Sequence, residues 1–174
     1  MAEDDPFQSF GVTEVYHFTD LLNLDSIRQK GGLFCFRKLR EMGLSDVHPG
    51  GNEWSHEADA NRGLDQYVHL CFLKNHPMEY AARMAGRITC SRFIPIDSEV
   101  LFWDGVLFTN DVSNKSGVIP FGLERAKKMI DFEVLFTRMD WTNSQIRARR
   151  QKAEKSEILV PNHIPLKYMK LPNG

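Results

Sequence analysis

The sequence predicts an α+β domain in which two curved β-sheets pack together, with helices along one side. Many short apolar runs of strand length alternate with only a few segments of helical periodicity, a mixture typical of this class. The 174-residue chain contains no internal repeat, low-complexity tract or domain linker. We therefore expect a single domain that spans residues 1–174 and is long enough to bury a core.

The first half of the chain is expected to alternate between strands and helices. Residues 11–18 alternate in polarity as a strand does. Asp20 is suited to cap a following helix, which the glycine pair at 31–32 would end. Further elements are expected as a strand at 33–36, helical turns at 37–42, a strand at 67–73 and a helix at 77–86.

The second half is expected to be richer in strands. Strands are predicted at 88–96, 100–103, 106–109, 157–160 and 168–171, with a strand or extended piece at 132–136. Helices are predicted at 123–129 and after Thr142 or Asn143, either of which can cap. The stretch 43–63 shows no pattern, and long patternless stretches in compact domains are usually functional or mobile.

Composition excludes several classes of protein. The formal net charge is −1, so any binding to nucleic acid must come from local basic runs, such as 147–155 and 124–128. Cys35, Cys71 and Cys90 lie far apart, each in an apolar run, which disfavours a disulfide framework or zinc site and predicts buried thiols. The chain shows neither a signal sequence nor an apolar run of membrane-spanning length, so we expect a cytoplasmic protein without a membrane partner.

One acidic residue stands out as a candidate for chemistry. Glu157 begins an apolar strand directly after a basic segment that contains Arg147, Arg149 and Arg150. A carboxylate held on a rigid strand beside a cationic surface can act on an anionic substrate. Glu154 is the alternative acid, one helical turn earlier, where an exposed charged helix face is the simpler interpretation.

Five blocks, in order, resemble the DarT family of toxins, which use NAD to ADP-ribosylate a base of single-stranded DNA. Together they extend from residue 16 to about residue 168, nearly the whole chain. The order of the blocks carries the resemblance, because each block alone is a weak signal. They are Tyr16-His17-Phe18-Thr19 with Asn23-Leu24 and Ser26-Ile27, then Leu64 to Phe72, His76 to Ala81, Val106 to Asn110, and Ala153 to Val160.

The resemblance implies an ADP-ribosyltransferase-like fold with NAD as co-substrate and Glu157 as the catalytic acid. Cleavage of NAD passes through a positively charged ribose, which a nearby carboxylate stabilises. Glu157 would hold the nicotinamide ribose hydroxyls and could accept the proton of the attacking base. The resemblance further implies a toxin of a toxin–antitoxin or phage-defence system, with a macrodomain antitoxin as partner.

The N-terminal block would form the NAD site. His17 and Thr19 lie on the same face of one strand, because side chains alternate with period two. The resemblance implies that His17 binds the nicotinamide ribose and that Thr19 and Asn23 line the nucleotide pocket. Tyr67 could stack on nicotinamide. The alternatives are a core histidine, an exposed asparagine and a tyrosine that only packs.

An arginine should hold the two phosphates of NAD, since its planar fork binds such oxygens with two hydrogen bonds. Arg62 is the candidate, because it is the only arginine or lysine between Arg40 and Lys74. Arg37 or Arg40 could fill this role instead, and Arg62 could be a solvated loop charge.

Single-stranded DNA is the expected substrate, because base modification needs an accessible base. Trp54, in the patternless stretch, could stack on an unpaired base, a contact worth roughly 1–3 kcal/mol, or it could pack on the core. Arg147, Arg149 and Arg150 could follow the DNA backbone or form a solvated helix face. No metal-ligand spacing is present, so no metal is expected.

Two positions depart from the family pattern and leave the modified base open. His69 stands where the family usually has proline, and Cys71 stands where an aromatic residue is common. Two other functions remain possible on the sequence alone. One is transfer of ADP-ribose to RNA or protein, and the other is a nucleic-acid-binding module that has lost catalysis.

Overall fold

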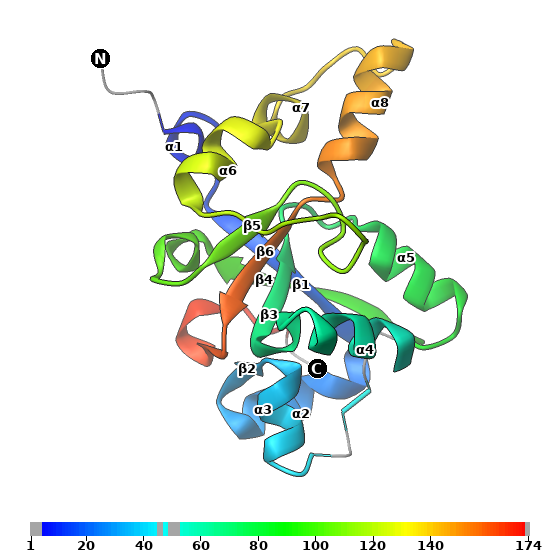
Figure 1. Ribbon diagram of the computed structural model, residues 1–174, viewed down its shortest axis with the longest axis vertical. Helices are drawn as coiled ribbons and strands as arrows, with labels where there is room; N and C mark the ends of the chain where they lie inside the picture. The colour runs from blue at the N-terminus through cyan, green and yellow to red at the C-terminus, as the bar shows by residue number, and fades with distance from the viewer. Residues whose placement is uncertain (1–4, 45–46, 49–52, 173–174) are drawn as a thin grey trace.

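The computed structural model describes residues 5–44, 47–48 and 53–172, and it shows an α+β architecture (Figure 1). The elements follow in the order α1 (Pro6–Ser9), β1 (Glu14–Asp20), η1 (Leu21–Asn23), α2 (Leu24–Lys30), β2 (Gly32–Phe34), α3 (Phe36–Glu41), α4 (Glu53–Asn61), η2 (Leu64–Gln66), β3 (Tyr67–Cys71), α5 (Pro77–Met84), β4 (Ser91–Asp97), η3 (Ser98–Phe102), β5 (Leu107–Thr109), α6 (Leu123–Met129), α7 (Phe132–Phe136), α8 (Ser144–Ala153), β6 (Glu157–Pro161), β7 (His163–Pro165) and η4 (Leu166–Tyr168), where η marks a 3-10 helix.

The strands form two sheets of unequal size. Five of them make a sheet in the order β4-β1-β3-β6-β5, and β2 pairs with β7 in a second sheet. Every pairing is antiparallel. The predicted α+β class with two sheets is confirmed, although the second sheet is only a two-stranded ribbon.

The register of the large sheet determines which side chains meet at its centre. Glu157, the first residue of β6, pairs with Cys71 of β3 on one side and Thr109 of β5 on the other. Cys71 in turn pairs with Tyr16 of β1. Strands from four separate parts of the chain therefore converge on the residue that the sequence singles out.

The position of β6 within the core explains why its sequence is a continuous run of apolar residues. Ile158, Leu159 and Val160 are each 0% exposed, so both faces of this strand are covered. On one side of the sheet the core continues into an aromatic cluster in which the ring centroids of Phe7 and Phe132 lie 4.9 Å apart. Edge-to-face ring pairs of this kind add to the stability that burial provides.

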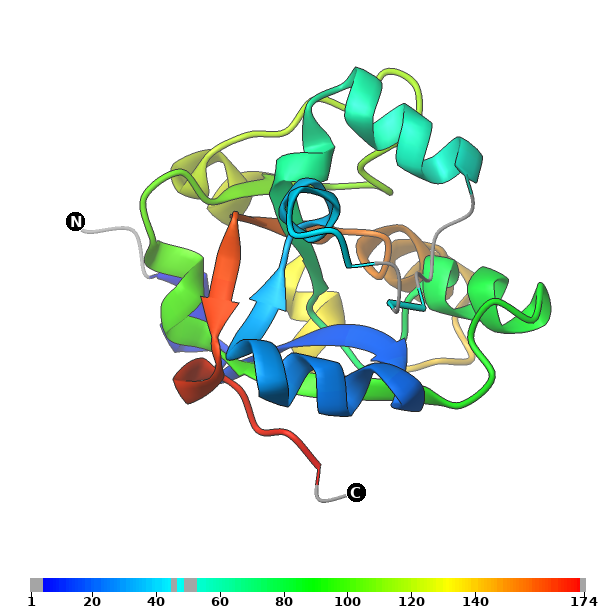
Figure 2. The same ribbon diagram turned by 90° about the horizontal axis from the view of Figure 1, so that it is seen from below.

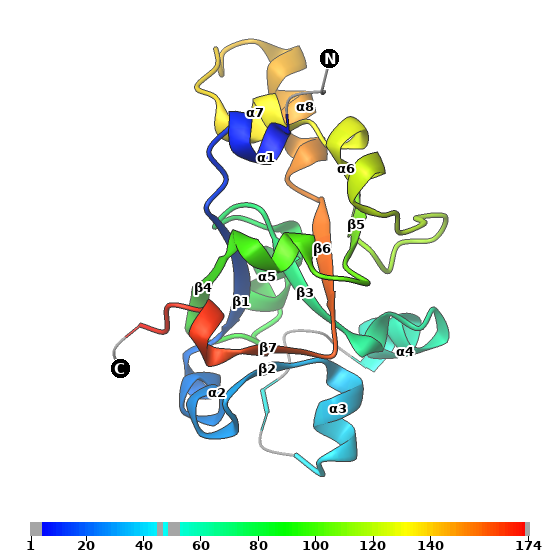
Figure 3. The same ribbon diagram turned by 90° about the vertical axis from the view of Figure 1, so that its left-hand side faces the viewer.

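The sequence suggested helices along one side, but most of the helices lie at the two ends of the molecule, with α5 beside the large sheet between them (Figure 1). Figures 1 and 3 show α1, α6, α7 and α8 at one end, whereas α2, α3 and α4 lie with the β2–β7 ribbon at the other. Seen from the second end, α3 is viewed nearly end-on near the middle of the picture, with α2 across the lower part and α4 across the upper part (Figure 2). None of the helices among residues 5–44, 47–48 and 53–172 has both the length and the apolar character needed to cross a bilayer.

Several local elements differ from the sequence-based expectation. Residues 132–136 form the short helix α7, capped by the Asp131 side chain on the Val134 amide at 3.2 Å. Residues 98–102 form a 3-10 helix, and Leu166–Tyr168 forms another, followed by a single bridge from Met169 to Ile96. Short apolar runs do not distinguish a buried strand from one helical turn, which explains all three differences.

The structure also corrects the expectations for residues 43–63 and for the cysteines. Helix α4 occupies Glu53–Asn61 within the stretch expected to be a loop. Cys35 and Cys71 are buried free thiols as expected, but Cys90 is only half-buried. No group of three or more His, Cys, Asp or Glu side chains within the described ranges could hold a metal ion.

Candidate active site

A cavity of about 240 Å³ opens at the centre of the large sheet. Its walls come from β1, β3 and the start of β6, from α2, α3 and α4, and from the loop after β5. Of the residues singled out from the sequence, His17, Thr19, Asn23, Tyr67 and Glu157 line this cavity. The fold therefore brings together five side chains that come from three distant parts of the chain.

Glu157 lies in the wall of the cavity and is 5% exposed. Its two carboxylate oxygens face different histidines. Oε2 lies 3.3 Å from Nδ1 of His69, and Oε1 lies 3.6 Å from Nε2 of His76, which is beyond hydrogen-bond distance. Desolvation alone would raise the pKa of Glu157, but the hydrogen bond and the charge of His69 lower it. The carboxylate is therefore ionised at neutral pH.

His69 carries the opposite charge. Desolvation acts to lower its pKa, but the hydrogen bond and negative charge of Glu157, together with the charge of Asp59, raise it to about 9. Asp59 also lines the cavity, from α4, and desolvation raises its pKa. The cavity thus holds an ion pair with a second acidic group beside it.

His17 is neutral and its tautomer follows from one contact. Nδ1 lies 3.0 Å from the backbone carbonyl oxygen of His69. A carbonyl oxygen only accepts, so Nδ1 carries the proton and Nε2 is left as an acceptor. Desolvation lowers the pKa of His17 to about 4. This ring can therefore accept a hydrogen bond from a hydroxyl group within the cavity.

Thr19 and Asn23 form one edge of the cavity. The Asn23 side-chain amide donates to Thr19 Oγ1 at 2.9 Å and to the His48 carbonyl at 2.8 Å, while its oxygen accepts from the His48 amide at 2.9 Å. Asn23 is therefore a buried anchor for residue 48 and not an exposed helix residue. Tyr67, half-buried at the start of β3, also contributes to the wall.

Arg62 lies outside the cavity lining. Its guanidinium donates to the backbone carbonyls of Ser113 at 2.8 Å and Lys115 at 2.7 Å, and also to the carbonyl of Val118. These bonds tie the end of α4 to the loop after β5, which contributes Ser113 to the cavity. A role for Arg62 in binding phosphate stays a prediction.

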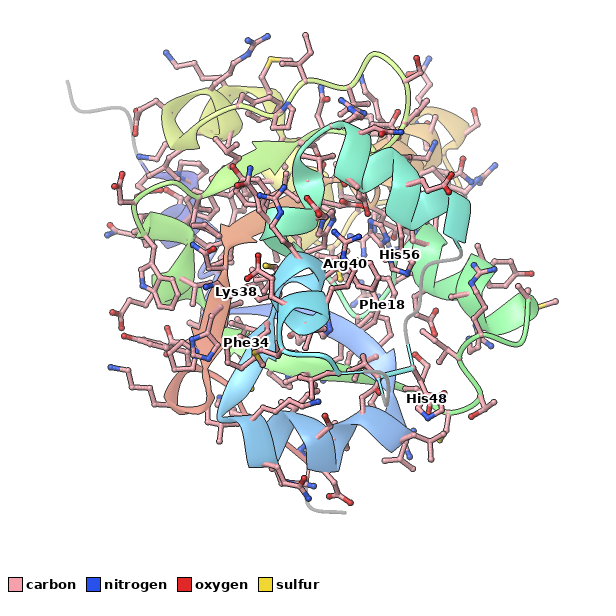
Figure 4. The ribbon with its side chains drawn as sticks, turned by 60° about the horizontal axis from the view of Figure 1, so that its bottom comes forward. Phe18, Phe34, Lys38, Arg40, His48 and His56 are labelled. Atoms are coloured by element: carbon pink, nitrogen blue, oxygen red, sulfur yellow. The ribbon has the colours of Figure 1, made fainter. Side chains whose placement is uncertain are left out.

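The alternative arginines share one carboxylate. Arg37 and Arg40, both on α3, lie 2.7 Å and 3.0 Å from the buried Asp65, which lines the cavity. Figure 4 shows Arg40 on the side of α3 that faces Phe18 and His56, with Lys38 on the opposite side. Neither arginine lines the cavity, although their shared partner Asp65 does.

The α8 arginines proposed to contact DNA do not line the cavity. Helix α8, with Arg147, Arg149 and Arg150, lies at the opposite end of the molecule from α2 and α3 (Figures 1 and 3). The backbone of Trp54 belongs to α4, but its side chain lies outside the described part of the structure. Their contacts with DNA therefore stay predictions.

The α8 arginines differ in how their charge is balanced. Arg149 pairs with Asp131 and Glu133, at 2.7 Å each, and Arg150 pairs with Glu154 at 2.6 Å. Arg147 instead donates to the backbone carbonyls of Trp141 and Thr142. The pairing of Glu154 with Arg150, away from the cavity lining, separates this acid from Glu157.

Sequence reasoning missed much of the lining. It did not single out the aromatic wall of Phe18, Phe34 and Phe36, or the acidic residues Asp59 and Asp65. Phe36 stacks on His56 with ring centroids 4.0 Å apart. Two features of the sequence could have pointed to the missed lining: the repeated Phe residues around position 34, and His69 in β3, where the family usually has proline.

The sequence profile of one protein family, described as "ssDNA thymidine ADP-ribosyltransferase, DarT", matches residues 16–171. No curated protein sequence matches the chain. Several solved structures share its fold, at sequence identities below 20%.

Two of these structures come from Thermus sp. 2.9 DarT. Its complex with ADP-ribosylated ssDNA has a TM-score of 0.67 at 18% identity and covers 91% of this chain and 79% of that chain. Its complex with NAD+ has a TM-score of 0.60 at 18% identity, with 91% and 80% coverage. Thermosipho africanus DarTG in complex with ADP-ribose has a TM-score of 0.63 at 15% identity, with 91% of this chain and 43% of that chain covered.

Proposed function

This chain belongs to the DarT family of NAD-dependent ssDNA thymidine ADP-ribosyltransferases, and on that premise we propose that Glu157 carries the transfer reaction. The observation that supports this assignment is the position of Glu157. It is an ionised, nearly buried carboxylate in the wall of a cavity that also contains the neutral imidazole of His17.

The chemistry requires a group that stabilises a developing cation. The bond between C1′ of the ribose and the nicotinamide nitrogen breaks, and nicotinamide leaves with the electron pair. The ribose becomes positively charged, and a fixed carboxylate in a site of low water content stabilises it. A ring nitrogen of thymine then bonds to C1′ and loses its proton, which Glu157 can accept.

The side chains in the cavity fit the nicotinamide half of NAD. His17 offers Nε2 as an acceptor for a ribose hydroxyl, and Thr19 lies on the same strand and wall. Tyr67 and Phe18 supply aromatic surface on which a flat ring can stack. Asn23 holds residue 48 in place at the edge of this site.

An arginine is proposed for the pyrophosphate, with Arg62 as the first candidate and Arg40 as the second. Arg62 would have to release backbone carbonyls of the loop after β5 to reach a phosphate. Arg40 shares Asp65 with Arg37, so Arg37 alone could satisfy this carboxylate while Arg40 binds the anion. Arg62→Ala and Arg40→Ala can be ranked by their loss of affinity for NAD relative to DNA.

The path of the DNA is proposed to include Trp54 and the α8 arginines. Among Arg147, Arg149 and Arg150, Arg147 is the one whose described partners are neutral carbonyls, so its charge is available to a phosphate. We further propose that residues 1–174 act as one cytoplasmic transferase domain. Its biological role would be that of a toxin in a toxin–antitoxin or phage-defence system, countered by a macrodomain antitoxin.

The substrate test uses the unmodified protein, NAD and single-stranded oligonucleotides. One oligodeoxynucleotide contains a single thymidine, a second has that thymidine replaced by deoxycytidine, and an RNA of the same order contains uridine. Mass spectrometry should show one added ADP-ribose on the first oligonucleotide alone. Modification of the RNA or of protein instead would support the alternative acceptors. Absence of nicotinamide release would support a binding module without catalysis.

A further inference from the structure

The ring of His69 lies between two oxygen atoms of the protein. Nε2 lies 3.1 Å from the carbonyl oxygen of Leu64, and Nδ1 lies 3.3 Å from Oε2 of Glu157. Neither a carbonyl oxygen nor an ionised carboxylate can donate a hydrogen bond. With Glu157 ionised, both ring nitrogens therefore carry protons and the ring is an imidazolium, in agreement with its raised pKa.

A third polar group contacts the same ring nitrogen. The hydroxyl of Ser113, which is 2% exposed, lies 3.3 Å from the same Nδ1. A hydroxyl can accept as well as donate, so the Nδ1 proton can be shared between Ser113 and Glu157. The loop after β5, which Arg62 ties to α4, thus completes the surroundings of the ring.

His76 faces the other carboxylate oxygen in a different protonation state. Its Nδ1 accepts a hydrogen bond from the Met78 amide at 3.3 Å as the N-cap of α5, so this nitrogen carries no proton. Its Nε2 therefore carries the proton and points toward Glu157 Oε1, and it forms no hydrogen bond with any described residue. Desolvation lowers the pKa of His76, which keeps the ring neutral.

We propose that His69 is a positioning residue of the transfer reaction: as an imidazolium it keeps Glu157 ionised and orients its carboxylate toward the cavity. This inference rests on the proposed role of Glu157. The same residue also positions His17, because the backbone carbonyl of His69 accepts the His17 Nδ1 proton. One residue of β3 thus orients the acid and the neutral imidazole that line the cavity.

The physical need for His69 comes from the cost of a buried carboxylate. An unpaired carboxylate in a nearly buried site takes up a proton, since desolvation disfavours its charged form. Other titratable groups around Glu157 within the described residues do not supply a matching positive charge. They are Asp59 on α4, Cys71 on β3, His17 on β1 and His76 before α5.

The pH dependence of transfer separates this role from a purely structural one. In the unmodified protein, Glu157 stays ionised to low pH because its pKa lies below the usual value of 4.5. His69→Phe keeps an aromatic ring but removes the cation. The acid limb of the kcat/KM profile should then move up by about one pH unit or more, the size of effect that a close opposite charge exerts.

A second variant tests the contribution of geometry. His69→Asn places an amide donor near the position of Nδ1 but carries no charge, so we expect a smaller upward shift of the acid limb. His163→Asn is the matched control. His163 stacks on Phe34 with ring centroids 4.1 Å apart and does not line the cavity, so its pH profile should coincide with that of the unmodified protein.

The protonation state of the His69 ring can be measured directly, without a substitution at this position. Imidazole nitrogen NMR of the unmodified protein should show the His69 ring doubly protonated at pH 7.5, with loss of one proton near its raised pKa of about 9. In Glu157→Gln the same ring should titrate at or below the ordinary value of 6.5. A neutral His69 ring at pH 7.5 in the unmodified protein would overturn the proposal.

The outcomes also distinguish this inference from the proposed function. If Glu157→Gln is fully active, the role of Glu157 fails and the inference fails with it. If Glu157→Gln is inactive but His69→Phe has the acid limb of the unmodified protein, only the role of His69 fails. If His69→Phe does not fold, the NMR titration of the unmodified protein still tests whether the His69 ring is charged, on which the proposal depends.

Discussion

Helix α8 and the central cavity both concentrate charged side chains, but the two regions handle charge in opposite ways. On α8, Arg149 and Arg150 each meet carboxylates at the surface, where 40% and 26% of their side chains are exposed. In the cavity, Glu157 is 5% exposed and is paired with a single half-buried histidine. Helix α8 has the longer run of charged residues in the sequence, but each of its charges is expected to interact more weakly with its partner than the charge of Glu157 does in the cavity.

The difference follows from solvent. Exposed ion pairs are worth about 0–1 kcal/mol because water and salt screen them. A charge held in a nearly buried site must instead be matched by a partner, and removal of that partner changes its protonation state. Chemistry is therefore expected in the cavity, and an electrostatic contribution to DNA binding is expected on α8.

The largest expected effect separates the two acids that compete in the sequence. Glu157→Gln should lower the rate of ADP-ribose transfer by about 10²–10³-fold, since an amide cannot offset the charge of the ribose. Affinity for NAD, measured by calorimetry, should change little. Glu154→Gln is the matched control, because Glu154 pairs with Arg150 outside the cavity and should leave the rate unchanged. Equal losses in both variants would contradict the distinction between the two regions.

A smaller effect is expected at His17. His17→Asn preserves a donor for the His69 carbonyl but removes the acceptor at Nε2. Loss of one hydrogen bond to the ribose should raise the KM for NAD by roughly threefold to tenfold. Steady-state kinetics with varied NAD would measure the change. An unchanged KM would assign His17 to the core and not to the substrate.

The buried titratable groups predict a stability maximum near pH 6.5. His69 has a raised pKa, so its contribution is complete below the ordinary value of 6.5 and is lost as the pH rises toward 9. His17 and His76 have lowered pKa values, so they destabilise the fold as the pH falls below 6.5, and Glu157 adds a further loss at lower pH. Urea midpoints between pH 4 and 10 would measure this curve.

His69→Phe sharpens the stability prediction. It should flatten the alkaline side of the curve, since the group that loses a proton between pH 6.5 and 9 is gone. A curve that keeps its alkaline slope in this variant would place the titrating group elsewhere.

The smallest expected effect concerns DNA binding by α8. Arg147→Ala should reduce the salt dependence of binding by about one counterion, whereas Arg149→Ala should leave it nearly unchanged because two carboxylates already offset Arg149. Fluorescence anisotropy with a labelled single-stranded oligonucleotide at several salt concentrations would measure both slopes. Equal slopes in both variants would show that carboxylate pairing does not decide which arginine meets phosphate.

The sequence singled out five residues that the structure brings to one cavity, but it misassigned some of the elements around them. Glu157 and His17 were singled out because they lie in blocks that resemble the DarT family, and the structure places both in the wall of the cavity. The helix α7 was mistaken for a strand because Phe132–Phe136 is too short for periodicity to decide. The carbonyl partners of Arg62 lie 51 to 56 residues away in the chain, so no local pattern could reveal them.

The contact partners and the protonation state of His69 could not be predicted from the sequence. Its departure from the family pattern was visible, but its partners were not. Leu64 and Glu157 lie 5 and 88 residues away, and only the register of β3 with β6 brings the second contact into range. Protonation of this ring depends on that register, so it could be assigned only after the fold was known.

The catalytic role of Glu157 can be tested by a crystal structure of Glu157→Gln with NAD and a single-stranded oligonucleotide that contains thymidine. We expect the nicotinamide ribose to lie in the central cavity, with a hydroxyl about 2.6–3.2 Å from the side chain at position 157 and another near Nε2 of His17. A nicotinamide ribose bound outside this cavity, beyond the reach of position 157, would contradict it.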